Sequence, residues 1–535
     1  MLAGCMAVSM GLPNAHGADP LPQAPLPRPV FLDFSPKPGE VAQWWRALHR
    51  ELEVQNDPTK IVRFLRKAQQ IYTLQSWNFE FLEPLCNLTL AELEYLLHAN
   101  QAQMSKDPAL LGMLQKEALV KLRDLCLRMA TEPFLERKCD RAVEFFQGLA
   151  GPTTGQRQTV VGNGTSLGLY WGDLHVHSAF SYDAFCSPSH CLGFARQVMN
   201  FDFLAFAEHA FMFDSGRNRI FNTDAIGFWN MHKQLWEREL ETGLTLFAGQ
   251  EWGGRFGQGH RNLIFKPGPY PDKPYSVLHA ETNSLGQLIN TMRSERCQAI
   301  SIMHHTAFSG QMGSNFPIHT PGYERLIEIT SDNGLFEKPG DPISLSSTGE
   351  AAAGRTVQDA LLKGMRLGIV GQSDNHSGMP GLFVPGKTGY GGKPGFTVVF
   401  AKSGNMEDLY SALYLRHCYG TDGRRIFLDF RINDQLMGSE LVQPCTDDMV
   451  ITISAKGTAP LESITILRNE KVFLEVSPNQ MTFSMNKRIA GDRDFGKRLL
   501  TAARSERTSE FYRVVVGQQD GFHAWSSPIW VDYAV

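Results

Sequence analysis

Histidines and carboxylates recur at the ends of short apolar runs in the middle of this chain. The first run ends in Asp173-Leu174-His175-Val176-His177, and the next ends in Ala207-Glu208-His209. Later runs end in Gly249-Gln250-Glu251, Met303-His304-His305 and Ser373-Asp374-Asn375-His376. Imidazole and carboxylate groups are ligands of zinc, manganese and iron, so this placement predicts a site that holds several metal ions.

Strands must position these side chains. Residues two apart in a strand project to the same side, so His175 and His177 can reach one metal from the end of the first strand. In βα barrels the functional residues gather where strands end, and here several strands deliver ligand-type side chains. A lone histidine is more often a packed or surface residue, but five or six at equivalent positions are not expected by chance.

Residues 161–423 alternate short apolar runs with helical stretches, which is typical of a parallel sheet with crossover helices. Helices are expected between the strands, for example over 224–241 and 356–365. Seven βα units of the α/β class predict a closed or nearly closed barrel. The expected strands are 169–175, 202–207, 244–249, 299–303, 325–330, 367–371 and 396–401.

The regions on either side of this barrel have different patterns. Residues 31–160 carry apolar side chains at helical spacing and predict an N-terminal helical domain. Residues 424–535 alternate apolar and polar side chains, as at Leu428, Phe430 and Ile432, and predict an antiparallel β-sandwich.

The first 30 residues resemble an export leader followed by a proline-rich linker, although the expected basic segment is missing. Leu2-Ala3-Gly4-Cys5 also resembles a lipoprotein cleavage box. A periplasmic or secreted protein with a possible lipid anchor at Cys5 is therefore expected, with a cytoplasmic location left open. No stretch approaches the roughly 20 apolar residues of a membrane span, so no integral membrane segment is expected.

Length and charge bound the remaining possibilities. A chain of 535 residues is too long for one core and predicts two or three domains. The formal charge of −4 and the lack of a polybasic run argue against a nucleic-acid partner. The nine cysteines are scattered and do not fix the compartment. The sequence predicts no oligomeric state.

The ordered motifs of residues 170–400 resemble the PHP (polymerase and histidinol phosphatase) superfamily of metal-dependent phosphoesterases. The motifs that carry the resemblance are Gly172-Asp173-Leu174-His175-Val176-His177-Ser178, Asp183 eight positions after His175, Glu208-His209, Glu251 and Ser373-Asp374-Asn375-His376. The resemblance implies a distorted (βα)7 barrel with three divalent metals, zinc, manganese or iron.

The resemblance also implies a ligand set. His175, His177, Glu251 and Asp374 would hold the first metal and form the catalytic group. Glu251 would bridge to a second metal, bound by His260 and by His304 or His305, and the third would lie among Asp183, His209 and His376. Two positions depart from the family pattern. Glu208 replaces an aspartate and is expected to support the ligands, and the choice between His304 and His305 is open because strand neighbours point to opposite faces.

Metal ions about 4 Å apart can generate hydroxide at neutral pH and clamp the oxygens of a phosphoryl group. The predicted function is therefore hydrolysis of phosphate esters by a metal-bridging hydroxide. Small organic phosphodiesters are the preferred substrates, ahead of monoesters. Arginines in loops after the ligand-bearing strands are candidate phosphate contacts, because their guanidinium groups can form bidentate hydrogen bonds. These candidates are Arg217, Arg219, Arg255 and Arg261.

Two alternatives stay open. The same hydroxide could attack a carbonyl carbon, in a metal-dependent ester, lactone or amide hydrolase. The chain could instead be a surface binding protein with a structural metal site, in which the sandwich engages a partner.

Overall fold

The computed structural model describes residues 158–534, with gaps. The predicted leader with Cys5, most of the predicted helical domain, and Asp183, Arg217, Arg219 and Arg255 lie outside the described residues. The gaps are 163, 179–180, 182–183, 185–187, 198, 211–228, 230–232, 234–235, 237–243, 255–256, 269, 310–311, 317–318, 344–348, 377–379, 382–391 and 492–508.

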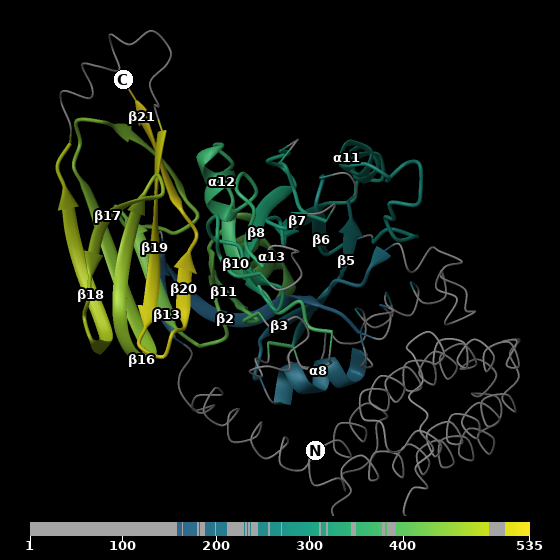
Figure 1. Cartoon of the computed structure of the whole chain (residues 1–535), viewed down its shortest axis with the longest axis horizontal. Coiled ribbons are helices and arrows are strands. Elements are labelled where there is room, and N and C mark those ends of the chain that lie inside the picture. Colours follow the sequence, from purple (N-terminus) through teal and green to yellow (C-terminus); the bar gives the residue numbers. More distant parts are fainter. Residues whose placement is uncertain are drawn as a thin grey trace, which may run out of the picture.

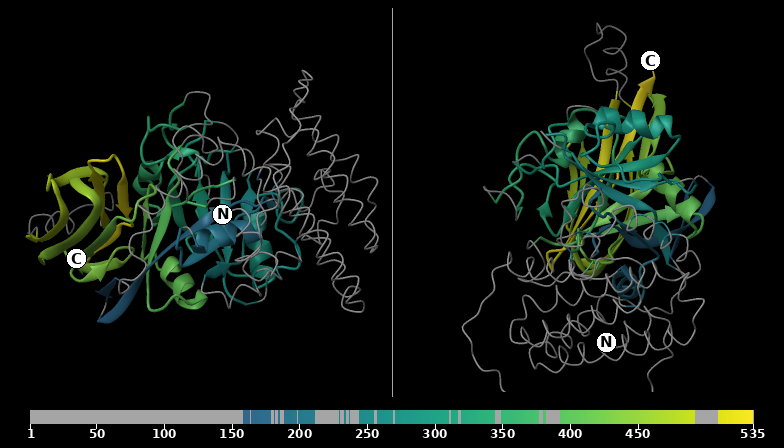
Figure 2. Two further views of the ribbon diagram at one scale, coloured as in Figure 1. Left: turned by 90° about the horizontal axis from the view of Figure 1, so that it is seen from below. Right: turned by 90° about the vertical axis from the view of Figure 1, so that its right-hand side faces the viewer.

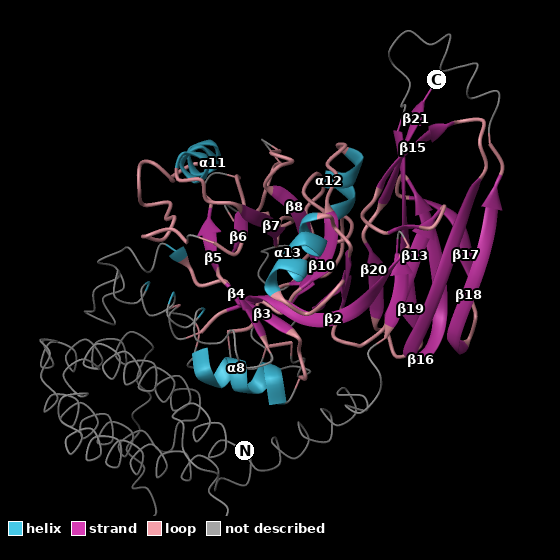
Figure 3. Ribbon diagram, turned by 180° about the vertical axis from the view of Figure 1, so that it is seen from behind, coloured by secondary structure: helices cyan, strands magenta, loops and turns pink. Residues whose placement is uncertain are grey.

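The described part is mixed α/β and contains far more sheet than helix (Figure 3). A large sheet begins with three parallel strands in the order β2-β3-β4, and β11 and then β12 follow on the other side of β2 in antiparallel pairings. From Leu167 onward β2 is buried on both faces, as expected for a strand inside such a sheet. The bounds are β1 Thr159–Gly162, β2 Thr165–Val176, β3 Phe203–Phe206, β4 Thr245–Phe247, β11 Phe396–Ala401 and β12 Cys418–Thr421.

A smaller sheet has the order β10-β8-β7-β6-β5, with β9 paired to β8. Strands β10, β8 and β7 are parallel, whereas β6 runs antiparallel to both β5 and β7. The bounds are β5 Gly249–Gly253, β6 His260–Phe265, β7 Ala299–His304, β8 Glu324–Ser331, β9 Gly334–Leu335 and β10 Gly368–Gly371.

Each of the seven predicted strand ranges overlaps an observed strand, but these strands do not form seven parallel units. Strand β6 was not predicted. It follows β5 in a hairpin whose connection holds Gly257 and Gly259, both at φ +77°, a conformation that suits glycine. The two sheets meet through parallel bridges between Val176 and Asn375 and between His209 and Glu251. A closed (βα)7 barrel stays unconfirmed.

The C-terminal strands form a layer beside this region (Figure 1 and the left view of Figure 2). They are mostly antiparallel, as predicted, except that β15 and β21 pair in parallel. They are also not a separate sheet, because β20 pairs with β12 and so extends the large sheet. The bounds are β13 Phe427–Ile432, β14 Gln435–Leu436, β15 Glu440–Pro444, β16 Met449–Arg468, β17 Lys471–Val476, β18 Gln480–Ile489, β19 Ser509–Gln518, β20 His523–Ser526 and β21 Ile529–Ala534.

Four helices are described, and three have N-caps that explain where they begin. Thr356 forms a reciprocal capping box with Asp359 at the start of α12, close to the predicted 356–365 helix. Ser284 and Asn405 cap α11 and α13 through side-chain oxygens. None of the described helices is both long and apolar enough to cross a membrane. The bounds are α8 Pro188–Gln197, α11 Leu285–Ser294, α12 Val357–Leu362 and α13 Met406–Tyr414.

Candidate metal centre

Neighbouring strand ends bring the predicted ligands to one place. The backbone N–H of His177 donates to the carbonyl of Asn375 at 2.9 Å, which ties the end of β2 to the segment after β10. The N–H of Glu251 donates to the carbonyl of Glu208 at 2.9 Å and ties β5 to the end of β3. The side chains on these ends therefore converge between the two sheets.

Four overlapping groups of side chains each place their ligand atoms within 4.8 Å of one another and could hold a metal ion. Every predicted ligand among the described residues belongs to at least one group. The groups are Glu251 with His260, His304 and His305; His177 with His209 and His376; His175 with His177 and Glu251; and His175 with His304 and Asp374.

Glu251 is the carboxylate at the centre. Its Oε1 lies 2.6 Å from His260 Nδ1. Its Oε2 lies 3.2 Å from His209 Nδ1 and 3.4 Å from His177 Nε2. With 1% of the side chain exposed, this carboxylate is surrounded by imidazoles and has the placement expected of a bridging ligand.

Asp374 is the second inward carboxylate. Its Oδ1 lies 3.0 Å from His175 Nε2 and 3.3 Å from His177 Nε2. Its Oδ2 accepts a hydrogen bond from the Asn333 side-chain amide. The backbone of Asp374 has φ +53°, an uncommon conformation for a residue other than glycine. Asn333 therefore orients the carboxylate toward the two histidines.

The electrostatics of the site favour the protonation states that metal binding requires. Burial, together with neighbouring imidazoles, lowers the pKa of His177 to about 3 and that of His305 to about 3. The same two causes hold the pKa of His304 well below its usual value. These three rings are neutral near pH 7, and a neutral imidazole has a nitrogen lone pair for a cation.

The carboxylates are held in their charged form. Burial works to raise the pKa of Glu251 and of Asp374, but the surrounding histidines outweigh it and keep both well below the usual range. His175 is different. Burial works to lower its pKa, yet the carboxylates of Asp374 and Glu328 hold it well above the usual value. A cation bound at His175 would therefore have to displace a proton.

The hydrogen bonds of His177 fix which ring nitrogen faces the carboxylates. When Glu208 is ionised, Ser181 Oγ donates to Glu208 Oε2 at 2.6 Å and therefore accepts from His177 Nδ1, which lies 3.0 Å away. The proton is then on Nδ1, and the Nε2 lone pair points at Glu251 and Asp374 oxygens 3.4 and 3.3 Å away. Three electron-rich atoms facing one another in a buried site repel, and a cation between them removes the repulsion.

Several buried ring nitrogens around the site have no hydrogen-bond partner within the part of the chain that the structure describes. They include His177 Nε2, both nitrogens of His304, and His305 Nδ1. Buried polar atoms are normally paired, so an inward-facing set of this kind fits metal ligation. Mixed imidazole and carboxylate donors suit zinc, manganese or iron.

Supporting residues were missed at the level of sequence. Glu328 of β8 lies 2.8 Å from His175 Nδ1, and Asn333 binds Asp374. Glu328 lies among the buried apolar side chains Leu326, Ile327 and Ile329 of β8, and a carboxylate at that position was the available signal. Asn333 follows the end of β8, so the strand-end rule that found the ligands would also have found it.

Glu208 and Asp173 also support the ligands. Glu208 accepts hydrogen bonds from the Ser178 N–H at 2.9 Å and from Ser181. Burial raises the pKa of Glu208 to about 7, against these hydrogen bonds. Asp173 accepts from the backbone N–H groups of His175 and Ser373 at 3.1 Å each, which links β2 to the segment that carries Asp374.

Arg261 does not face the ligands. Strand alternation turns it away from His260, and its fully buried guanidinium pairs with Glu324, with Nε donating at 2.9 Å. Its Nη1 also donates to the Gly259 carbonyl at 3.0 Å. These contacts make Arg261 a packing residue, and the prediction that it binds substrate does not fit this position.

Comparison with known proteins gives relatives without an assigned activity. No family model matches the chain. An uncharacterized protein of Chlamydia trachomatis serovar D is 30% identical over 382 residues, which cover 69% of this chain and 58% of that protein. An uncharacterized protein of Chlamydia muridarum is 29% identical over 379 residues with the same coverage. The chain therefore spans 58% of the length of these relatives.

Among solved structures, the chain is similar to a two-domain protein from Bacteroides vulgatus described as containing a predicted PHP-like metal-dependent phosphoesterase. The sequence identity is 14% and the TM-score is 0.37, over 71% of this chain and 98% of that one. A likeness this low carries no argument about the activity of the chain.

Proposed function

We propose that this chain is a metal-dependent phosphoesterase of the PHP superfamily. The observation that carries the proposal is the His177 Nε2 lone pair aimed at the carboxylates of Glu251 and Asp374 in a fully buried site. His175 carries a proton toward Asp374 Oδ1, 3.0 Å away, and a cation bound between these side chains would take the place of that proton. The ordered motifs around these residues support the same family.

Divalent cations held here would supply hydroxide at neutral pH and neutralise the charge that develops on a phosphoryl group. Side chains of this chain would hold those cations, and neighbouring residues fix the orientation of these side chains. His175, His177, Glu251 and Asp374 form the catalytic group. Ser181 fixes the tautomer of His177, and Glu328 binds His175 through Nδ1 so that Nε2 faces Asp374.

Small organic phosphodiesters are the proposed substrates, with Asp183 completing the ligand set and Arg217, Arg219 and Arg255 as candidate phosphate contacts. Substituting each arginine by lysine should raise KM for a phosphodiester more than it lowers kcat if that residue forms a bidentate contact. Three cations per chain, the helical domain at 31–160 and export with lipid attachment at Cys5 stay predictions.

The direct test is hydrolysis of bis(p-nitrophenyl) phosphate and of p-nitrophenyl phosphate by protein that has been stripped with a chelator and then given manganese or zinc. We expect activity that depends on the metal, with the diester turned over faster. Turnover of p-nitrophenyl acetate above that of both phosphates would select carboxyl-ester chemistry instead. No metal-dependent cleavage of any ester would contradict the proposal.

A further inference from the structure

Four donors from three adjacent strands meet beside the central carboxylate. Glu251 lies in β5, His260 opens β6, and His304 ends β7, with His305 directly after it. One ligand atom from each of the four lies within 4.8 Å of the others. The pairing of His260 with His304 across β6 and β7 fixes two of these donors in register.

The backbone at His305 explains how two adjacent histidines reach the same point. In a regular strand, neighbouring side chains point to opposite faces. His305 has φ +34°, outside the strand region, so the alternation ends at His304. The His305 ring is turned to the same side, with its centroid 4.2 Å from that of His304 and 4.9 Å from that of His260.

The His305 ring is held in this orientation by its own loop. It stacks on Phe308 with centroids 4.7 Å apart and an interplanar angle of 26°. The N–H of Phe308 donates to the His305 carbonyl at 3.3 Å, which closes the turn. Only 5% of His305 is exposed, and its Nδ1 has no hydrogen-bond partner among the described residues. A strained backbone and an unpaired buried nitrogen are costly unless a ligand uses them.

We infer that His305 is the fourth protein ligand of one cation, together with Glu251, His260 and His304, and that this set selects zinc. The inference rests on the metal centre of the proposed function and adds a ligand that resolves the choice between His304 and His305. Three imidazoles and one carboxylate satisfy tetrahedral zinc without an outside ligand, so the hydroxide of the proposed reaction would come from the cations held by His175, His177 and Asp374. This zinc is then the cation that the protein releases last.

The test measures how much zinc the protein retains and does not depend on enzymatic activity. Wild-type protein, the His305→Phe variant and a His523→Ala control are loaded with zinc, dialysed against a chelator and measured by elemental analysis. His523 is a matched control because it lies in β20, pairs with Asp422 and belongs to none of the four groups of candidate ligands. Wild type and the control should keep one tightly held zinc per chain. His305→Phe should bind that zinc at least about 100-fold more weakly, because even loss of an outer partner costs roughly 10- to 100-fold.

Coordination geometry gives a second readout, and its X-ray absorption measurement needs only the wild-type protein. X-ray absorption of wild-type protein holding one zinc should show three imidazoles and one carboxylate. Cobalt in the same site should give the intense visible absorption of a tetrahedral complex, and His305→Phe should lose it while the His523→Ala control keeps it. Two imidazoles in the zinc shell, or an unchanged affinity in His305→Phe, would overturn the inference.

These outcomes are separable from failure of the proposed function. Protein that retains zinc through His305 but cleaves no phosphate ester would refute the phosphoesterase and leave the four-ligand site standing. Protein that cleaves phosphodiesters but releases all zinc at the same rate in wild type and His305→Phe would refute the four-ligand site alone.

Discussion

Two buried polar clusters in this molecule have opposite characters. In the C-terminal layer, Arg513 of β19 is 1% exposed, and each guanidinium nitrogen has a partner. Its Nε and Nη2 donate to Glu470 at 2.7 and 2.6 Å, and its Nη1 donates to Glu337 at 2.8 Å. Between the two sheets, by contrast, carboxylate oxygens and imidazole lone pairs face one another.

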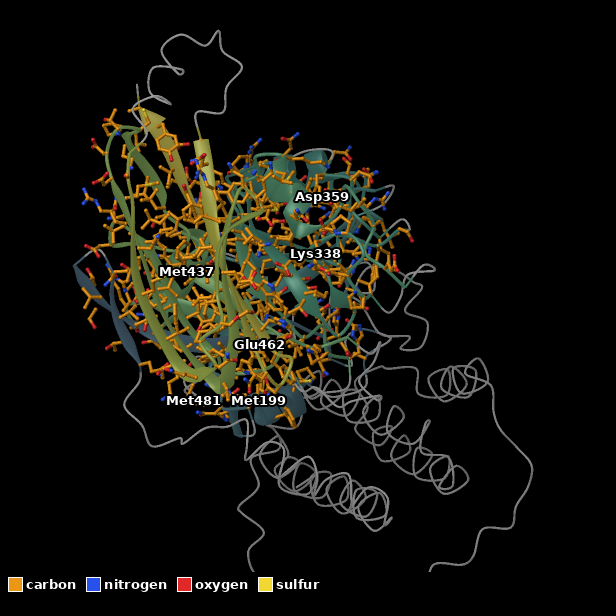
Figure 4. The ribbon with its side chains drawn as sticks, turned by 60° about the vertical axis from the view of Figure 1, so that its left-hand side comes forward. Met199, Lys338, Asp359, Met437, Glu462 and Met481 are labelled. Carbon is orange, nitrogen blue, oxygen red and sulfur yellow. The ribbon has the colours of Figure 1, made fainter. Side chains whose placement is uncertain are left out.

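This difference in pairing distinguishes a cluster that stabilises the fold from a cluster that can bind a cation. Burial works to lower the pKa of Arg513, but Glu470 and Glu337 raise it above its usual value, so a paired charge is locked in place. Glu337 also accepts from the Trp525 indole at 3.1 Å and so joins the C-terminal layer to the segment next to Lys338. Figure 4 labels Lys338, which lies beside the C-terminal strands in that view. Pairing of every donor is typical of a structural cluster, and donors left facing one another are typical of a ligand site.

The largest expected effect is on catalysis. Asp374→Asn should lower hydrolysis of bis(p-nitrophenyl) phosphate by roughly 10⁴-fold, or about 5 kcal/mol, because a neutral amide cannot hold a cation between His175 and His177. The rate is measured per folded molecule, because the charged Asp374 also stabilises the metal-free fold. Asp447→Asn, at an exposed turn, is the control and should leave the rate unchanged. Full activity in Asp374→Asn would contradict the assignment of Asp374 to the cation-binding cluster.

Substitution in the Arg513 cluster should change the stability of the protein and not its rate of hydrolysis. Arg513→Met should lower the free energy of unfolding by about 3 kcal/mol, because it leaves the carboxylates of Glu470 and Glu337, 3% and 14% exposed, without Arg513 as a partner. The rate per folded molecule should stay the same. Arg488→Met, which removes an exposed pair with Asp448, should barely move the denaturant midpoint. A large rate loss with normal stability in Arg513→Met would mean that the two clusters are not independent.

Cations should stabilise the folded protein through the unpaired cluster. Free zinc or manganese at 100 times its dissociation constant should add about 2.7 kcal/mol, measured as a rise in the denaturant midpoint after chelator treatment. Arg513→Met should show the same gain, whereas Asp374→Asn should show less. No change on adding either cation would count against a metal centre.

Glu328 allows the orientation of a ligand to be tested. Glu328→Gln should weaken metal binding by about 10- to 100-fold, because loss of the charged partner makes His175 a poorer donor. Glu328→Asp should restore part of the affinity and shift its pH dependence. Equal affinities in all three proteins would show that Glu328 serves packing alone.

The smallest expected effect is a pH dependence at Glu208. Its pKa is about 7 in the folded protein and near 4.5 without burial, so the unfolded chain loses this proton first. The metal-free protein should therefore lose stability as pH rises from about 4.5 to about 7, by at least about 1 kcal/mol. Glu208→Gln should remove that decline, and parallel stability curves for the two proteins would contradict the assignment.

The sequence predicted the location of the site better than its architecture. Runs that end in His175, His209, Glu251 or Asp374 are strands whose ends converge, because strand position and residue type are both visible in the chain. Strand direction is not visible in this way. The antiparallel hairpin of β5 and β6 depends on the backbone of Gly257 and Gly259, which alternation of apolar runs does not report.

The sequence also did not predict the residues that hydrogen-bond to the ligands, because these residues lie far from the ligands along the chain. Glu328 is 153 residues from His175 in the sequence, and Asn333 is 41 residues from Asp374. Strand alternation predicts that His304 and His305 point to opposite faces. The positive φ of His305 ends the strand at His304, so the prediction does not apply to His305. Arg261 lies beside a ligand in sequence but on the other face of its strand.

The most direct test of the central claim is anomalous diffraction from crystals grown with zinc or manganese. We expect peaks enclosed by the donors around Glu251, His177 and Asp374, with metal–nitrogen distances near 2.0–2.1 Å for zinc. Absence of any peak there, with the histidines turned away from the two carboxylates, would contradict the account.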